Sequence, residues 1–85
     1  MRHATNVALD ALEPLLRELR AIPTLTERKR GVFYRGSRAF LHFHEDSAGF
    51  FADVRLDETW TRVDVTQARG RGSLVRRVRR EAGGS

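Results

Sequence analysis

Two histidines separated by one residue, His42 and His44, are the side chains in this sequence best placed to do chemistry. Side chains on a β-strand alternate between its two faces, so both imidazoles would point to the same side of a sheet. A pair on one face is the arrangement that a histidine metal site or a proton-transfer pair would require. Asp46 and Asp53 could supply an oxygen ligand or orient one of the rings. The candidate metal ligands are therefore His42, His44 and Asp53.

A structural role competes with this chemical one, because the motif is short. A complete zinc site has three or four ligands, supported by hydrogen bonds from neighbouring groups. The third histidine, His3, is too close to the end of the chain for the sequence to fix its position. In the structural alternative, His42 hydrogen-bonds Asp53 and stabilises the sheet, while the C-terminal helix or another subunit covers the neighbouring aromatic rings. The sequence favours this alternative and predicts no catalytic residue.

The elements that must position these residues follow from hydrophobic spacing. Leucine and isoleucine recur every three or four residues over 10–22, which predicts one long helix that ends before Pro23. Residues 24–31 are expected to be a charged connection. After it the spacing becomes alternating, and short turns between the runs predict an antiparallel meander. Its four expected strands are residues 32–35, 39–44, 50–56 and 60–65.

A second, shorter helix is expected at the C-terminal end. Gly70 and Gly72 argue against helix before Ser73, so the prediction covers only residues 73–82. The expected fold class is α+β, with an N-terminal helix packed on a four-stranded antiparallel meander and a short C-terminal helix. The expected organisation is a loose N-terminus (1–9), a single domain (10–68) and a basic segment containing arginine and glycine (69–85).

Alternation along the strands predicts two unlike sheet faces. One face is apolar, contains Val32 and Tyr34, and would pack against the leucines. If Glu45 and Phe50 close the turn of the central hairpin, His42 lies opposite Asp53 on the other face. That register also places His44 opposite Phe51, and Phe40 opposite Arg55. We call this second face, which is also expected to contain Phe33, the His/aromatic face; its predicted binding residues are Phe40, His42, His44, Phe51, Asp53, Arg55, Trp60 and Arg62.

The net charge of +5 is concentrated at the C-terminal end. Residues 1–65 contain ten basic and ten acidic side chains, whereas residues 66–85 contain six arginines and only Glu81. Such a segment could follow the phosphates of nucleic acid, although a solvated helix face is the favoured interpretation. The candidate nucleic-acid contacts are Arg69, Arg71, Arg76, Arg77, Arg79 and Arg80.

The composition excludes several classes of chemistry. The chain has no cysteine, so a disulfide framework, a thiolate metal site and a cysteine nucleophile are all ruled out. A cytoplasmic location and no membrane association are expected, because no apolar run approaches the ~20 residues that cross a bilayer. A chain of 85 residues has little room for an enclosed pocket, which argues against an enzyme. Homodimerisation through the His/aromatic face or an edge strand is one expected association.

The order of several segments also resembles a known group of proteins. The residues that carry the resemblance are Leu19 to Thr26, Gly31 to Tyr34, Arg38 to Asp46 and Ala52 to Leu56, with F-x-H-x-H-x-D from Phe40 to Asp46 as the most specific part. The chain resembles small uncharacterised bacterial proteins, some of which are labelled luciferase-domain proteins. The resemblance implies that residues 15–65 form one folded domain. No flavin or nucleotide motif accompanies it.

The sequence therefore favours a non-enzymatic module that binds a small ligand or a protein through the His/aromatic face. Two alternatives stay open: a nucleic-acid-associated protein using the arginines, and a metal-dependent or acid–base enzyme using His42 and His44. A divalent metal ion is the one cofactor that the residue types suggest. The sequence names neither the ligand, nor the metal, nor the oligomeric state.

Overall fold

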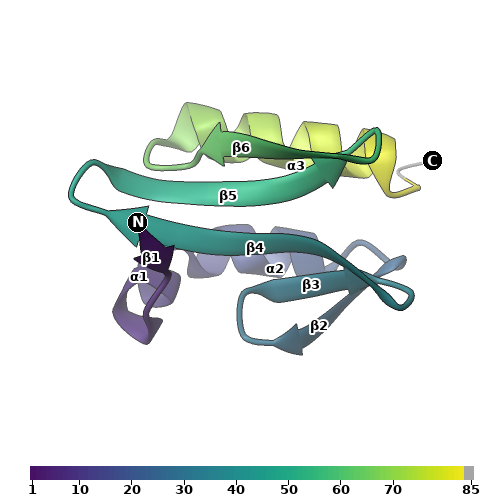
Figure 1. The fold of residues 1–85 in the computed structure, drawn as a ribbon, viewed down its shortest axis with the longest axis horizontal. Helices are drawn as coiled ribbons and strands as arrows, with labels where there is room; N and C mark the ends of the chain where they lie inside the picture. The colour runs from purple at the N-terminus through teal and green to yellow at the C-terminus, as the bar shows by residue number, and fades with distance from the viewer. Residues whose placement is uncertain (84–85) are drawn as a thin grey trace.

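The fold is a single antiparallel sheet with three helices, described for residues 1–83 by a computed structural model. Residues 84 and 85, the end of the predicted basic segment, lie outside the described residues. Figure 1 shows the elements in chain order. They are β1 (Arg2–His3), α1 (Asn6–Ala11), α2 (Glu13–Arg20), β2 (Leu25–Lys29), β3 (Val32–Arg35), β4 (Arg38–Asp46), β5 (Gly49–Leu56), β6 (Thr59–Asp64) and α3 (Ala68–Glu81). Within residues 1–83, no helix is long and apolar enough to cross a membrane.

The sheet has six strands, so the prediction of a four-stranded meander is wrong, although the α+β class is confirmed. Its order is β2-β3-β4-β5-β6, and β1 pairs with β4 off this path. The four predicted strands correspond to β3 to β6. Strand β2 was missed because four of its five residues are polar or charged, with only Leu25 buried. Strand β1 was missed because two residues show no periodicity.

The predicted long helix over 10–22 is two helices. Thr5 begins α1, because its side-chain oxygen accepts a hydrogen bond from the amide of Ala8. The helix is interrupted at Leu12, which ends α1 and precedes α2. Pro14 then lies in the first turn of α2, where its missing N–H is not needed. Residues 1–9, expected to be loose, contain β1 and the first turn of α1.

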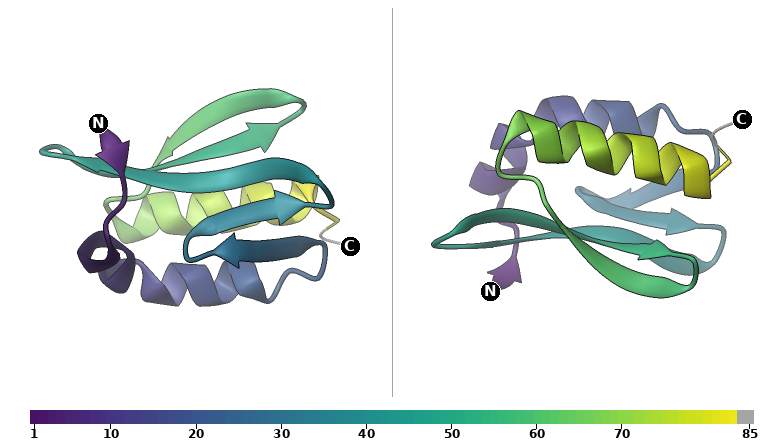
Figure 2. Two further views of the ribbon diagram at one scale, coloured as in Figure 1. Left: turned by 60° about the horizontal axis from the view of Figure 1, so that its bottom comes forward. Right: turned by 90° about the horizontal axis from the view of Figure 1, so that it is seen from above.

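All of the core lies between the helices and one face of the sheet. Figure 2 shows α2 and α3 on the same side of the strands. The predicted packing of one N-terminal helix on the sheet is therefore corrected to two helices, α2 and α3, on one face, and α3 buries Leu74, Val75 and Val78 in the same core. Helix α3, which contains the six arginines of the basic segment, is thus part of the packed domain. The other core residues are Leu9, Leu12, Leu15, Leu16, Leu19, Ile22, Leu25, Phe33, Phe40, Leu41, Phe43, Ala52, Val54, Val63, Val65 and Ala82.

A bulge in β4 overturns the predicted faces of the neighbouring strand. Phe33 pairs with Leu41 and Tyr34 with Ala39, which leaves Phe40 as the extra residue. A shift of one residue exchanges the two faces of a strand. Phe33 and Phe40, both predicted on the His/aromatic face, are instead core residues with 0 % and 2 % of their surface exposed. Tyr34, predicted to be in the core, is only half-buried and lies under the guanidinium of Arg28.

Helix α3 begins at Ala68, five residues before the predicted start, and includes both glycines. Gly70 lies so close to the end of β6 that an added Cβ would be 1.9 Å from the carbonyl oxygen of Asp64. At Gly72 the nearest atom to an added Cβ is the flexible guanidinium of Arg76, at 3.3 Å. The sequence rule treated both glycines as helix breakers, but only the tertiary contact at Gly70 requires glycine.

The two glycines make a matched pair of variants for testing this packing. We expect Gly70→Ala to lower the free energy of unfolding by about 1 to 3 kcal/mol, because the helix must move away from the strand. Gly72→Ala should raise it by about 0.5 to 1 kcal/mol, because alanine has the better helix propensity. Urea unfolding followed by circular dichroism measures both. Equal effects of the two substitutions would contradict the close approach of α3 to β6.

Candidate metal centre

The β4–β5 hairpin has the register that the sequence predicted. His42 lies opposite Asp53, His44 opposite Phe51, and Glu45 opposite Phe50. The loop is tighter than expected, because Asp46 and Gly49 also pair and leave a two-residue turn. Leu41 and Phe43 are buried beneath the helices, so the intervening histidine side chains emerge on the opposite face. The prediction that His42 and His44 share the face away from the leucines is confirmed.

The third histidine joins this pair, contrary to the sequence-based interpretation that set it aside. Strand β1 pairs with β4 and places His3 opposite His44. The ring centroid of His3 is 4.9 Å from that of His44 and 5.9 Å from that of His42. The ring centroids of His42 and His44 are 4.7 Å apart. One nitrogen from each ring lies within 4.8 Å of the other two. Three imidazoles therefore converge on one point of the sheet.

Glu45 holds β1 in place. Its carboxylate accepts hydrogen bonds from the backbone amide of Thr5, at 2.7 Å, and from the Thr5 hydroxyl, at 2.8 Å. These bonds hold the pKa of Glu45 below its usual value. Arg2 adds an ion pair to the same carboxylate, and the amide of Ala4 donates to the carbonyl oxygen of Phe43 at 3.0 Å. The position of His3 therefore depends on Glu45 of the neighbouring strand.

Asp53 orients one of the three rings. Its Oδ2 lies 3.1 Å from Nε2 of His44, so the contact predicted between His42 and Asp53 is made by His44 instead. Arg62 donates two hydrogen bonds to the same carboxylate, at 2.8 and 2.9 Å. These bonds hold the pKa of Asp53 below its usual value, so the group is ionised at neutral pH. A carboxylate beside one ring nitrogen of a histidine orients that ring and leaves the other nitrogen for a metal ion.

His42 contains an unsatisfied nitrogen. Its Nδ1 is buried, and no hydrogen-bond partner for it is present among the described residues. Burial, followed by the proximity of His44, lowers the pKa of His42 below 6.5, so the ring is neutral at physiological pH. A buried nitrogen without a partner costs about 1 to 3 kcal/mol, and a bound ion is one of the usual reasons for retaining it.

The remaining residues of the predicted His/aromatic face divide into two groups. Trp60 stays with the histidines, 5.3 Å from the ring centroid of His42, and the guanidinium of Arg55 lies 4.5 Å above the indole. Trp60 is 42 % exposed, because α3 packs on the opposite face and does not cover it. Phe51 is half-buried opposite His44, whereas Phe40 belongs to the core. The structure thus brings His42, His44, Asp53, Trp60 and Arg62 together.

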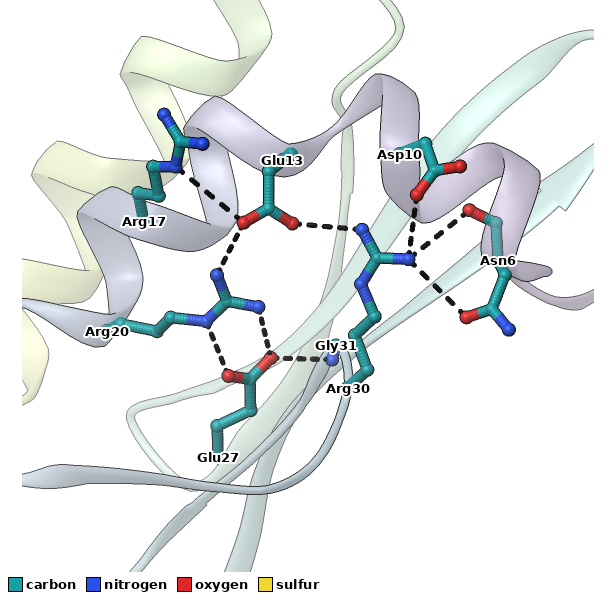
Figure 3. A network of polar contacts seen from close by, with 8 residues as sticks. All are labelled: Asn6, Asp10, Glu13, Arg17, Arg20, Glu27, Arg30 and Gly31. Atoms are coloured by element: carbon teal, nitrogen blue, oxygen red, sulfur yellow. Dashed lines mark hydrogen bonds and ion pairs between the residues drawn. The ribbon is translucent and has the colours of Figure 1, made fainter.

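A second polar cluster joins the helices to the β2–β3 turn (Figure 3). Arg20 bridges Glu13, at 2.6 Å, and Glu27, at 2.5 Å, while Arg30 contacts Glu13 at 2.9 Å and also Asp10. Hydrogen bonds from Arg30 and Arg20 lower the pKa of Glu13. Burial would raise the pKa of Glu27, but hydrogen bonds from Arg20 and the Gly31 amide outweigh it. Both carboxylates are ionised and fully engaged, which fits a structural role rather than acid–base chemistry.

The candidate nucleic-acid residues do not form one uniform set. Arg71 donates hydrogen bonds to the carbonyl oxygens of Val65, at 2.8 Å, and Thr66, at 3.1 Å. This guanidinium therefore caps the end of the sheet and has a structural role. The other five candidate arginines, like Arg71, lie on α3, away from the histidines.

No protein-family model, curated protein or solved structure matches this chain. The resemblance to luciferase-domain proteins stays a prediction.

The attachment of β1 can be tested at Glu45. We expect Glu45→Ala to accelerate hydrogen exchange of the Ala4 amide, because β1 loses the carboxylate that binds Thr5. Glu18→Ala is the control, since it removes the same charge from α2, where the described residues show no partner for it. Native-state exchange measured by NMR compares the two variants. An unchanged Ala4 exchange rate in Glu45→Ala would show that other contacts hold β1.

Proposed function

We propose that this domain binds one divalent transition-metal ion of the zinc class through His3, His42 and His44. The observation that carries the proposal is the convergence of three imidazole rings from two paired strands. The buried, unpartnered Nδ1 of His42 and the contact of Asp53 with His44 support it. A carboxylate behind a ligating histidine is the usual support of such sites, so Asp53, predicted as a ligand, is assigned here to orientation.

The chemistry of the three ligands favours zinc and its neighbours. Neutral imidazole nitrogens suit zinc, copper and nickel, whereas calcium and magnesium require oxygen ligands. Tetrahedral zinc at 2.0 to 2.1 Å from each nitrogen implies roughly 3.4 Å between ligand atoms. The nitrogens here lie within 4.8 Å, so binding draws the rings together. His3 can make that movement because its strand is only two residues long.

Three protein ligands leave one position of the metal open to a small molecule or a partner side chain. This agrees with a binding module that uses the His/aromatic face, beside the exposed Trp60. We place catalysis second, because Asp53 is already bound by Arg62 and His44, and its low pKa makes it a poor general base. A cytoplasmic location and a homodimer across the same face stay predictions.

Trp60 provides a direct readout of metal binding, because it is the only tryptophan of the chain and contacts His42. We expect one equivalent of Cu²⁺ to quench its fluorescence in the wild-type protein, and a large excess of Zn²⁺ to reverse the quenching by competition, because copper binds nitrogen ligands more tightly. His3→Ala, His42→Ala and His44→Ala should each weaken binding strongly. Asp53→Asn should weaken it roughly 10- to 100-fold, through loss of the group behind His44.

Asp57→Asn is the control for Asp53→Asn, since it removes the same charge in the β5–β6 turn, away from the rings. Thermal melting of each variant by circular dichroism identifies any that fail to fold. Binding of Cu²⁺ to a folded His3→Ala variant with wild-type affinity would overturn the three-histidine site. Equal losses in the two aspartate variants would remove Asp53 from its orienting role.

The pKa of His42 predicts how the stability of the metal-free protein depends on pH. This ring gains a proton near pH 6.5 in the unfolded chain but only at lower pH in the folded one. The unfolded state therefore binds more protons as pH falls below 6.5, and stability decreases until the pH passes the folded pKa. Thermal melting in EDTA between pH 7.5 and 5.5 should show this loss. His42→Ala should show a shallower dependence, and an identical slope would contradict the lowered pKa.

A further inference from the structure

The net charge of the protein is located on one helix. Residues 1–65 balance at ten basic and ten acidic side chains, and the excess of five positive charges comes from the six arginines and Glu81 that follow. Five of these six arginines have no partner among residues 1–83: Arg69, Arg76, Arg77, Arg79 and Arg80. The charge is therefore both concentrated and uncompensated.

These five arginines of α3 differ from those in the rest of the fold, which do have partners. Every arginine before residue 66 contacts a carboxylate or a backbone carbonyl. Even the exposed ones do so, as when Arg38 pairs with Glu58 at 2.8 Å and Arg28 donates to the carbonyl of Gly36 at 3.2 Å. Glu81, the only acid of α3, pairs with Arg35 and accepts a hydrogen bond from the backbone amide of Asp57, rather than pairing with an arginine of its own helix. Only on α3 are guanidinium groups left without protein partners in the described part of the chain.

Helical geometry places these groups on one side of α3. At 100° per residue, Arg69, Arg76 and Arg80 lie within about 40° of one another, and Arg77 and Arg79 flank them. The buried residues of the helix, Leu74, Val75 and Val78, lie on the opposite side. From Arg69 to Arg80 the rise is roughly 16 Å, a distance that spans about five phosphates of one nucleic-acid strand. We call these five arginines the arginine face.

A groove continues the arginine face toward the sheet. Arg77 and Arg80 line it, together with two threonines of β6, Thr59 and Thr61. Hydroxyl groups and arginines are both common ligands of phosphate oxygens. The other residues of the groove are Leu56, Asp57 and Glu81.

We propose that the arginine face binds the phosphate backbone of double-stranded nucleic acid without reading its sequence. Helix α3 has no aromatic residue on which unpaired bases could stack, which favours a duplex over a single strand. Its leucine and valines are buried in the core, whereas a helix that binds a membrane surface exposes an apolar face. The proposal is independent of the metal site, because the histidines emerge on the opposite side of the sheet.

Fluorescence anisotropy with a labelled 24-base-pair DNA duplex tests this proposal over a series of salt concentrations. We expect the logarithm of the association constant to fall linearly with the logarithm of salt concentration, with a slope of about −3 to −4.5 for three to five phosphate contacts. Arg76→Gln combined with Arg80→Gln should reduce the slope by about 2. The same variant should weaken binding tenfold or more near 0.1 M salt, because each lost contact removes roughly 0.9 of a log unit.

The control is Arg17→Gln combined with Lys29→Gln, which removes the same charge from the surface outside α3. It should change affinity no more than about twofold, a margin set by the weak effect of distant exposed charges. Equal losses in both double variants would overturn the proposal, because net charge alone would then explain binding. Binding to vesicles containing phosphatidylserine without binding to the duplex would also overturn it, as would a duplex affinity that does not depend on salt.

Discussion

The burial of Leu41 and Phe43 beneath the helices is the constraint on which the rest of the structure depends. Side chains alternate along β4 on the hairpin side of its bulge, so burying these two side chains forces His42 and His44 to the opposite face. The same constraint sets the register with β5, which brings Asp53 beside the rings. One hydrophobic requirement thus arranges both the core and the candidate metal centre. A slip of one residue would lose both together.

The bulge at Phe40 shows how one strand can serve two purposes. Strand β4 pairs with β3 on both sides of the bulge. Phe33 pairs with Leu41, and a regular ladder would turn Phe40 to the other face, whereas the bulge lets Phe33 and Phe40 both enter the core. Because β5 covers one edge of β4, both β3 and β1 must use the other edge, at opposite ends. The end nearer the hairpin turn is thereby open to the short strand that contains His3. The third imidazole of the candidate site comes from this arrangement.

Three clusters of polar side chains in the domain have different roles. The cluster around Glu13 and Glu27 has its charges satisfied internally, and it fastens the helices to the β2–β3 turn. At the histidines, Asp53 is satisfied by Arg62 and His44, but the Nδ1 of His42 is not. On the arginine face, no internal partner is present among the described residues. The unsatisfied Nδ1 of His42 and the unpartnered guanidinium groups of α3 therefore lie on opposite sides of the sheet, and these are the two places where we propose binding.

The sequence by itself determined the α+β class, four of the strands, the central hairpin register and the shared face of His42 and His44, because each follows from local periodicity. Tertiary structure alone decided the position of His3, since a two-residue strand has no pattern and is placed only by Glu45 and the edge of β4. It also decided the faces of β3, because a bulge inverts alternation without a clear sequence signal. Gly70 is the third example: helix propensity argued against it, but the close approach to Asp64 requires a residue with no side chain. Local rules predict what neighbouring residues do, whereas these three features depend on contacts between distant segments.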